Sequence, residues 1–511
     1  MSVLELRDGD ENASMRKTCE RPHLLTHRKT EVGLVFSRNK RRITATVAGI
    51  SAVALALSAC SSTSSTSSSS SSSEAASSSA AASGNSTASG GASGAGEDFC
   101  AAIKQQWPDD MTGKTVGIYT TIGTPEDQQW LPSFKPFEDC TGAKISWESS
   151  KEFEAQLKVR VASGNPPDIA FFPQPGLLKS IVESTGAVKP VPQFTSDNVD
   201  QYYSQALKGY GTVNDIYFAT PGDANVKSFV WYSPKAFKAA GYEVPKTYDE
   251  LVALSDKIAA TGKKPWCEGI GSGDATGWPA TDWLEDFVLR ESGPDVYTQW
   301  VNHDIPFNDP KIASALAKVG SFLKNPQYVN GGFGDVATIA STTFQDGGLP
   351  ITKGDCFMHR QASFYENFWP AGTTVAEDGD AYAFYLPTMS EDFGKPILGG
   401  GTFVGAFVDR PEVQAFQYYM TTPAWSDAYI VGGTNITANN ALDPSLITSP
   451  IGKLSYEILQ DPKAVFAFDA SDQMPSEVGA GAEWKQLTAW IATNQDDATT
   501  LNNIEAAWPA S

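Results

Sequence analysis

The sequence predicts an α/β protein whose parallel sheet is covered by helices on both faces. From Lys114 onward, short apolar runs alternate with stretches of helical periodicity. Strands and helices that alternate in this way form parallel sheets, which bind ligands outside the carboxyl ends of their strands. We therefore expect the loops 120–128 and 173–176 to line a binding site. The expected elements are a strand over 115–119, a helix over 125–139, a strand over 143–147, a helix over 153–163 and a strand over 168–172.

Further elements follow, and several helices carry capping or proline signals at their first residues. The expected helices are 247–260 with the capping box Thr247 and Glu250, a helix capped by Asp282 with Glu285, a helix opened by Pro411, and 484–492. Strands are expected over 228–232, 381–386 and 403–408.

The segment 57–60, Leu-Ser-Ala-Cys, ends an apolar run that follows a basic cluster. A basic region, a short apolar region and small residues before a cleavage point are typical of a secretory signal peptide, and this run is too short to span a membrane. The cysteine resembles the lipobox of bacterial lipoproteins, which implies that Cys60 is lipidated and becomes the new N-terminus. The alternative is an uncleaved anchor helix with a chance cysteine. Residues 1–34 carry scattered charges, so we expect translation to start near Val35.

The leader 1–59 would then be removed, and 60–97 would comprise the lipidated cysteine and a tether. From 61 to 96 nearly all residues are Ser, Ala, Gly or Thr, which cannot form a core and predict a flexible segment. Removing 1–59 takes away ten Lys or Arg and six Asp or Glu and leaves a formal charge of −25. A nucleic-acid or anionic-lipid binder needs the opposite sign, so we attribute this charge to solubility.

Four cysteines remain for the folded body, Cys100, Cys140, Cys267 and Cys356. An even number in an oxidising compartment predicts two disulfides. Three pairings are possible, and the short separation favours Cys100 with Cys140, which leaves Cys267 with Cys356. A zinc site is the competing interpretation, but the sequence has no CxxC motif and few histidines, so no metal is expected.

Motifs for nucleotide chemistry and for hydrolysis are absent from the sequence. It contains no phosphate loop, no dinucleotide fingerprint and no GxSxG, so we expect neither a cofactor nor a Ser or Cys hydrolase. A glycoside hydrolase needs only two carboxylates, and this acidic chain has too many for that signal to decide.

Tryptophan is the informative residue type, with 13 in the chain. Sugar sites combine an aromatic platform with amides, carboxylates and Arg that bind the hydroxyls. For any one tryptophan, packing in the core is the alternative. Those beside Gly, Pro, Asp or Asn are Trp130, Trp231, Trp278, Trp369 and Trp425.

Short motifs rich in Pro, Trp and Asn follow one another along the folded part of the chain. They are PPDIA (166–170), FPQPG (172–176), NVKS (225–228), VWYSP (230–234), PWC (265–267), GWPATDW (277–283), WVNH (300–303), IPFN (305–308), CFMHRQAS (356–363) and the block 469–481. In this order they resemble the α-glucoside-type group of carbohydrate ABC transporter solute-binding proteins. Single blocks are weak signals, but the ordered set is specific, and it covers about 114–508.

The resemblance implies a two-lobed periplasmic-binding-protein fold of type II, similar to maltose-binding protein, with discontinuous lobes and a hinge. Lobe 1 would comprise 98–224 plus 402–437, and lobe 2 would comprise 225–401 plus 438–511. The chain would cross the hinge near 222–228 and near 400–403, where glycines could absorb the backbone change. Sugar binding would close the lobes, and the closed form would dock on a permease.

The resemblance also implies ligand-binding residues in the cleft. They are Glu126, Asp127, Gln174, Asp223, Asn225 and Lys227 as hydroxyl partners, Trp278 as a platform under a pyranose ring, and Asp282, Arg360 and Asp472 as polar partners from the other lobe. Alternatives remain open: Asp282 caps its helix, Lys227 and Arg360 form structural ion pairs, and Asn225 holds the hinge turn. The family pattern also supports the pairing of Cys267 with Cys356, whereas that of Cys100 with Cys140 rests on spacing alone.

On this resemblance the protein is the substrate-binding component of an ABC sugar importer. It would be a monomer, lipid-anchored on the extracellular face of the membrane, and it would bind a mono- to oligosaccharide and the permease without acting as an enzyme. The alternatives are a lipid-anchored glycoside hydrolase, a structural adhesin, and a binding protein for a galactose-containing or β-linked oligosaccharide.

Overall fold

The computed structural model describes residues 96–331, 334–431 and 433–509, which all belong to one compact unit, Ala88–Ser511. The predicted leader, the lipidated Cys60 and most of the tether lie outside the described residues. Within the described part of the chain, no helix has the length and hydropathy needed to cross a membrane.

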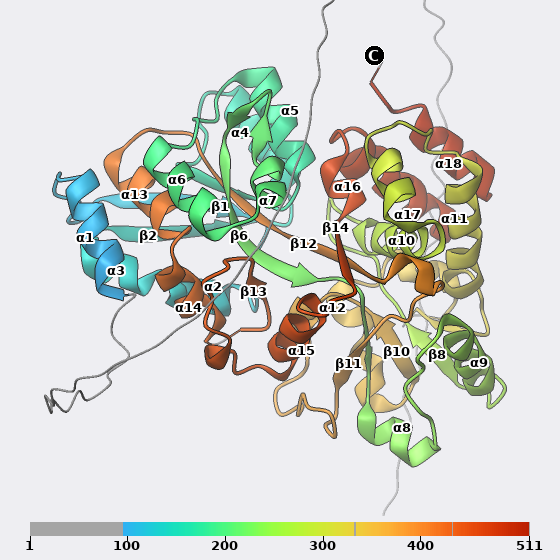
Figure 1. The fold of residues 1–511 in the computed structure, drawn as a ribbon. Helices are drawn as coiled ribbons and strands as arrows, with labels where there is room; N and C mark the ends of the chain where they lie inside the picture. Colours follow the sequence, from blue (N-terminus) through green and yellow to red (C-terminus); the bar gives the residue numbers. More distant parts are fainter. Residues whose placement is uncertain (1–95, 332–333, 432, 510–511) are drawn as a thin grey trace, which may run out of the picture. The chain divides into compact units, whose positions relative to one another are not determined.

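Two larger sheets and many short helices make up this unit (Figure 1). The strands of the first sheet are β1 (Thr115–Thr120), β2 (Lys144–Ser149), β3 (Ile169–Phe172), β6 (Ala219–Val226), β12 (Lys395–Ala406), β13 (Ile436–Thr437) and β14 (Ala464–Phe468). The strands of the second are β7 (Phe229–Tyr232), β8 (Lys264–Cys267), β9 (Val329–Asn330), β10 (Cys356–Arg360) and β11 (Tyr382–Tyr385). A small hairpin pairs β4 (Thr212–Val213) with β5 (Ile216–Tyr217).

The helices fall into the same two groups along the chain. Those before the second sheet are α1 (Gly96–Gln106), α2 (Asp127–Ser133), α3 (Lys135–Thr141), α4 (Phe153–Ala162), α5 (Pro175–Thr185), α6 (Gln193–Tyr202) and α7 (Gln205–Tyr210). Those that follow are α8 (Pro234–Ala240), α9 (Tyr248–Ala259), α10 (Trp278–Val301), α11 (Pro310–Leu323), α12 (Phe344–Gly347), α13 (Pro411–Tyr419), α14 (Pro423–Ile430), α15 (Pro450–Leu459), α16 (Ala470–Gln473), α17 (Trp484–Ala492) and α18 (Asp497–Glu505).

The first sheet has the order β13-β6-β12-β3-β1-β2, and β14 pairs with β12. Strand β1 is parallel to both β2 and β3, so the predicted parallel arrangement is confirmed for these three. Strand β3 is buried along its whole length, and its side chains alternate between two cores. Ile169 and Phe171 face the helices α1, α2, α13 and α14, and Ala170 and Phe172 face α4 and α5.

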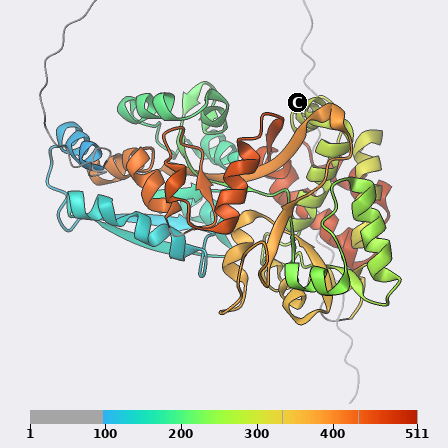
Figure 2. The ribbon, with the colours of Figure 1, turned by 60° about the horizontal axis from the view of Figure 1, so that its bottom comes forward.

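Segments from both ends of the described chain form the first of these cores. Helix α1 lies beside α13 in both views (Figures 1 and 2), and the rings of Phe99 and Tyr419 are 5.0 Å apart. The end of the chain therefore helps to cover the sheet that its beginning builds.

The second sheet has the order β11-β7-β10-β8-β9. Strand β7 again alternates between two cores: Val230 and Tyr232 pack with α9, α10 and α11, whereas Phe229 and Trp231 face the other side. Strands β6 and β7 are separated by only two residues, so the chain passes directly from one sheet to the other there.

Strand β12 connects the two halves a second time. Its first residues, 395–399, pair with β14, and its later residues pair with β6 and β3. The pairing with β6 shifts between Gly401 and Phe403, beside the predicted crossing at 400–403. The strand is longer than the expected 403–408, since it begins at Lys395 and ends at Ala406.

Two further expectations were wrong in detail. The helix expected over 125–139 is divided at Phe134 into α2 and α3, because Pro136 cannot continue the backbone hydrogen bonding of the preceding turn. Asp282 does not cap a helix: α10 begins at Trp278 after Gly277, and Asp282 lies one turn inside it. The N-cap at Thr247, the N1 proline at Pro411 and the helix over 484–492 are confirmed.

Both expected disulfides are present. Cys100 on α1 is bonded to Cys140 on α3, and Cys267 at the end of β8 is bonded to Cys356 at the start of β10, with Cα–Cα distances of 5.7 Å in each pair. Each bond therefore lies within one of the two halves.

Replacing Cys267 and Cys356 together by alanine is expected to lower the free energy of unfolding by about 2 to 5 kcal/mol, because this bond restricts the unfolded chain. Its sequence separation is 89 residues against 40 for the other pair, so loop closure predicts a smaller loss when Cys100 and Cys140 are replaced. Urea unfolding followed by tryptophan fluorescence measures both losses, and an unchanged stability of the first variant would contradict the expectation.

Candidate ligand-binding cavity

A partly open cavity of about 620 Å³ lies at the carboxyl ends of β1, β2 and β3. Residues 121–126 and 173–174 contribute to its wall, as the strand order predicted, and 149–151 after β2 join them. On the second-sheet side it is lined by Ser272, Ala275, Trp278, Phe344, Gln345, Phe364, Asn367, Phe368 and Trp484. The crossing segments β6 and β12 form its floor through Asp223, Asn225, Lys227 and residues 400–402.

Aromatic rings line the second-sheet side of the cavity. Trp278 is half-buried at the start of α10 and meets the ring of Phe344 edge-on at 5.0 Å, and Phe364 lies 6.1 Å from it. Gly277 permits this position, because its φ of +117° is unfavourable for other residues and a Cβ there would lie 2.2 Å from the carbonyl oxygen of Trp484. The aromatic surface is thus built where two helix starts come into contact.

Trp130 supplies an aromatic ring on the first-sheet side. It is 2% exposed and is held by Phe171 at 5.2 Å and by Tyr429 at 4.7 Å between ring centroids. An apolar ring that is fixed on both sides offers a surface of defined orientation to a ligand.

Asp223 on β6 is the centre of a buried hydrogen-bond network at the floor of the cavity. Its Oδ1 accepts from the backbone N–H and the hydroxyl of Thr402, at 3.1 and 2.8 Å. Its Oδ2 accepts from Asn435 Nδ2 at 2.8 Å and from the Tyr429 hydroxyl at 3.3 Å. Because all its accessible lone pairs are used, Asp223 connects β6, β12 and α14 more than it offers acceptors to a ligand.

Glu126 lies beside Asp223 and faces the cavity without a hydrogen-bond or ion-pair partner among the described residues. Burial, the charge of Asp223 and that of Asp127 raise the pKa of Glu126 to about 8. This carboxyl group is therefore largely protonated at neutral pH in the empty cavity.

Several other polar atoms on the wall are buried and lack a partner among the described residues. All but one are acceptors, and buried polar atoms without partners are rare in folded proteins because each costs the desolvation of the group. They are Glu154 Oε2, Gln174 Oε1, Asn225 Oδ1, Gln345 Oε1 and the single donor Trp484 Nε1. The cavity therefore fits a ligand with many hydroxyl or N–H donors.

Lys227 is the buried cation of the floor. Its Nζ donates to Asp469 Oδ2 at 2.5 Å and to Asp282 Oδ1 at 3.1 Å, and it lies 3.9 Å from Asp472 Oδ2. It also lies 5.3 Å from the ring centre of Trp278, a distance typical of a cation–π contact. The ammonium group thus connects the end of β6 to α10, α16 and the aromatic wall.

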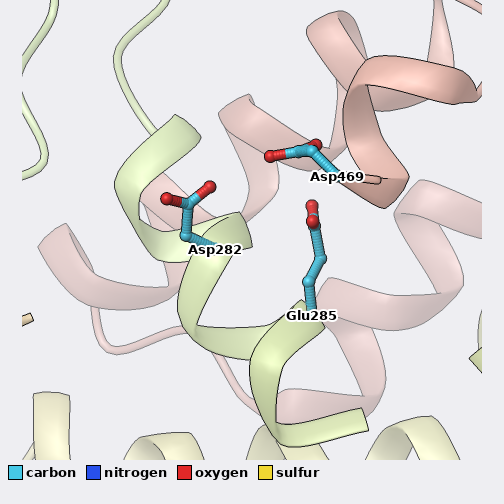
Figure 3. Close-up of side chains that lie close together, drawn as sticks. All are labelled: Asp282, Glu285 and Asp469. Carbon is cyan, nitrogen blue, oxygen red and sulfur yellow. The ribbon is translucent and has the colours of Figure 1, made fainter. Parts of the chain in front are cut away.

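Three carboxylates converge at this point, namely Asp282, Glu285 and Asp469 (Figure 3). Oxygen atoms at such spacing are typical of a cation site, but here Lys227 already binds two of the three residues. Glu285 accepts from the backbone N–H groups of Ala470 and Ser471 at 2.8 and 3.1 Å, so it holds the start of α16 in place.

A second layer of buried charge lies behind these residues. Arg360 donates to Asp286 and, at 3.3 Å, to Asp282, and Arg290 also donates to Asp286. All four side chains are at most 1% exposed. The predicted ligand partners Asp282 and Arg360 therefore do not line the cavity, and they hold its floor through ion pairs instead.

The buried carboxylates outnumber the buried cations, and the excess shifts their pKa values. Burial raises the pKa of Asp282 to about 7 against the opposing effect of Lys227 and Arg360. Burial together with neighbouring carboxylates raises the pKa of Glu285, Asp472 and Glu483 well above the ordinary value. Burial also disfavours the ionised form of Asp469, but Lys227 outweighs this and its pKa is lowered.

Seven of the ten predicted ligand-binding residues line the cavity: Glu126, Gln174, Asp223, Asn225, Lys227, Trp278 and Asp472. Asp127 is buried outside the lining and accepts a hydrogen bond from Thr124 at 2.8 Å. Among the five tryptophans singled out by their neighbours, Trp130 and Trp278 reach the cavity, whereas Trp231 and Trp425 are fully buried in the cores and Trp369 is buried away from it.

Several lining residues were not among the predicted ligand-binding set. Glu154 at the start of α4 follows a predicted strand by only a few residues, so the carboxyl-end rule could have included it. Phe344, Gln345 and Trp484 lie on segments whose position depends on tertiary packing, and no local signal in the sequence marks them.

The chain was compared with known protein families, curated proteins and solved structures. The family model described as bacterial extracellular solute-binding protein matches residues 122–350. An alpha-glucosides-binding periplasmic protein, AglE of Rhizobium meliloti, is 36% identical over 410 residues, which is 78% of this chain and 88% of AglE. The osmoprotective compounds-binding protein GgtB of Synechocystis is 37% identical over 403 residues, 78% of this chain and 94% of GgtB.

The similarity extends to solved structures at low sequence identity. The bacterial solute receptor AcbH, described as preferring β-D-galactopyranose, aligns with a TM-score of 0.66 at 17% identity over 77% of this chain and 98% of AcbH. This agreement, together with a maltose-bound receptor that shares the fold, confirms the predicted two-lobed α/β class of type II.

Replacing Lys227 by methionine is expected to lower the free energy of unfolding at pH 7 by about 3 to 5 kcal/mol, because it leaves buried carboxylates without their cation. Lys395 provides a matched control: it pairs with Asp461 at 3.1 Å but is 25% exposed, so Lys395→Met should cost less than about 1 kcal/mol. Urea unfolding of the two variants and the unchanged protein decides, and equal losses would count against the central role of Lys227.

Stability is expected to fall as the pH rises from about 5 to 8, and Glu126 contributes to this fall. Its pKa of about 8 and that of Asp282, about 7, lie above the unfolded values near 4. The stabilisation from these protonated groups is therefore complete below about pH 4 and is lost as the pH passes through 7 and 8. Glu126→Gln should make the pH profile of the unfolding free energy shallower, whereas the exposed control Glu183→Gln should leave it unchanged; identical profiles for all three proteins would refute this.

Proposed function

Because the chain belongs to the bacterial extracellular solute-binding protein family, we propose that it captures a glucoside or small oligosaccharide and delivers it to the permease of an ABC importer. The observation that carries this proposal is the cavity itself, in which aromatic rings from both sides enclose a set of buried acceptors without partners. A sugar satisfies both, since its C–H face packs on aromatic rings and its hydroxyl groups donate hydrogen bonds.

The relatives support the same class of cargo. AglE is described as binding α-glucosides, and GgtB as binding osmoprotective compounds. The protein would act by binding alone, without making or breaking covalent bonds in its ligand.

The two halves of the molecule would close on the sugar. In this proposal lobe 1 comprises 98–224 plus 402–437, and lobe 2 comprises 225–401 plus 438–511. The passages of β6 and β12 between the sheets support a hinge there, and the glycines at 400 and 401 lie within it. Cys60 would anchor the monomeric protein to the extracellular face of the membrane through a lipid.

Replacing Trp278 by alanine is expected to weaken sugar binding at least about tenfold, because it removes a ring surface from the wall of the cavity. Trp508 offers a matched control: it is half-buried as well, but it stacks on His303 at 3.9 Å and does not line the cavity. Trp508→Ala should leave the dissociation constant within about twofold of the original value.

The experiment uses the tether-free protein, residues 98–511, with trehalose, maltose, sucrose, isomaltose, raffinose and a β-linked disaccharide. Thermal unfolding identifies the sugars that stabilise the protein, and isothermal titration calorimetry then gives the dissociation constants. The proposal fails if no sugar of the panel binds, or if Trp278→Ala and Trp508→Ala have the same effect. Hydrolysis of any of these sugars by the purified protein would favour the glycosidase alternative.

A further inference from the structure

The charged groups around the cavity are strongly unbalanced toward the acidic side. Five carboxylates line it, namely Glu126, Glu154, Asp223, Asp469 and Asp472, and the lining contains two ammonium groups, Lys151 and Lys227. Lys227 lies within 4 Å of three aspartates, so its charge is already compensated. Lys151 is exposed at the rim. No uncompensated cation of the described residues is thus available inside the cavity to an anionic ligand.

Glu126 differs from the other acidic groups because nothing in the protein compensates it. Asp223 accepts four hydrogen bonds, and Asp469 is bound by Lys227. The groups that face Glu126 are Asp127 on its own helix, Asp223 on β6 and the hydroxyl of Tyr429 on α14, and none of them is a cation. Its carboxyl group therefore lies in a negative environment and points into the space where the ligand binds.

The apolar part of the wall favours the same ligand charge. Aromatic rings attract cations through their negative faces. Lys227 makes such a contact with Trp278, while no cation contact of this kind is recorded for Trp130, Phe344 or Phe364 among the described residues. A positively charged group of the ligand would therefore find both a carboxyl group and free ring faces.

We propose that this cavity prefers a glucoside that carries a positively charged nitrogen, with Glu126 as the counter-ion of that nitrogen, over the corresponding neutral glucoside, and that it rejects glucosides with a phosphate or carboxylate group. This inference rests on the proposed function, since it specifies the charge of the sugar that the cavity takes.

Binding of such a ligand is coupled to a proton. The pKa of Glu126 is about 8 in the empty cavity, so a cationic ligand that requires the ionised form displaces the proton to the buffer at pH 7. A neutral glucoside leaves the proton in place, because a protonated carboxyl group can donate a hydrogen bond to a hydroxyl oxygen.

The test uses matched sugars that differ only in charge, namely trehalose, 6-amino-6-deoxytrehalose and trehalose 6-phosphate, and the analogous maltose series. Isothermal titration calorimetry at pH 7 in two buffers of different ionisation enthalpy gives the dissociation constant and the number of protons released. We expect the amino derivative to bind about tenfold or more tightly than the neutral sugar with release of most of one proton, and the phosphate derivative to show no binding at millimolar concentration.

Glu126→Gln separates a charge effect from an effect of fit. This variant keeps the size and hydrogen-bonding capacity of the side chain but cannot ionise, so the preference for the amino derivative and the proton release should both disappear, whatever the absolute affinity. Glu183→Gln, on the exposed face of α5, should keep both.

The outcomes distinguish this inference from the proposed function. If the neutral sugars bind at least as tightly as their amino derivatives, or if the phosphates bind comparably, the inference is overturned and the proposed function stands. If the amino derivatives bind and the preference survives in Glu126→Gln, the assignment of Glu126 is wrong. If no member of either series binds, the proposed function and this inference fail together.

Discussion

The compensation of buried charge by Lys227 is the interaction on which the rest of the structure depends. Lys227 follows the last residue of β6, and its ammonium group is bound by Asp282 from α10 and Asp469 at the start of α16. Ions are transferred from water to a protein interior only at a cost of several kcal/mol each, so such groups are stable only where each finds its partner. The place where the chain leaves the first sheet is thereby fixed to helices that pack on the second.

The same network determines the shape of the ligand cavity. It holds Trp278 under a cation–π contact and Asp472 near the ammonium group, and Glu285 binds the backbone of α16. Side chains prepared in this way lose little conformational freedom when a ligand binds. Partnerless acceptors such as Gln174 Oε1 and Asn225 Oδ1 add to this effect, because their desolvation is already complete before the ligand arrives.

Sequence reasoning succeeded where local patterns determine the structure. The alternation of apolar runs predicted β1, β2 and β3 in the correct order, and the carboxyl-end rule placed the loops after β1 and β3 on the cavity wall. It failed where two local signals compete, as at Asp282, whose spacing to Glu285 is typical of a cap but whose carboxylate is needed by Lys227 and Arg360. Residues such as Trp484 and Phe344 could not be predicted, since only the packing of distant segments brings them to the cavity.

Strand β12 passes from the pairing with β14 to the pairing with β6 and β3 without a loop, through Gly399, Gly400 and Gly401. Beyond the glycines, Phe403 and Val404 point to opposite cores of the first sheet. Because side chains alternate with a period of two, a deletion or insertion of one residue in the glycine triplet would exchange these two faces along the rest of the strand. The length of this segment is therefore more tightly constrained than its small residues indicate, and in natural variants we expect substitutions here to be tolerated before any change in length.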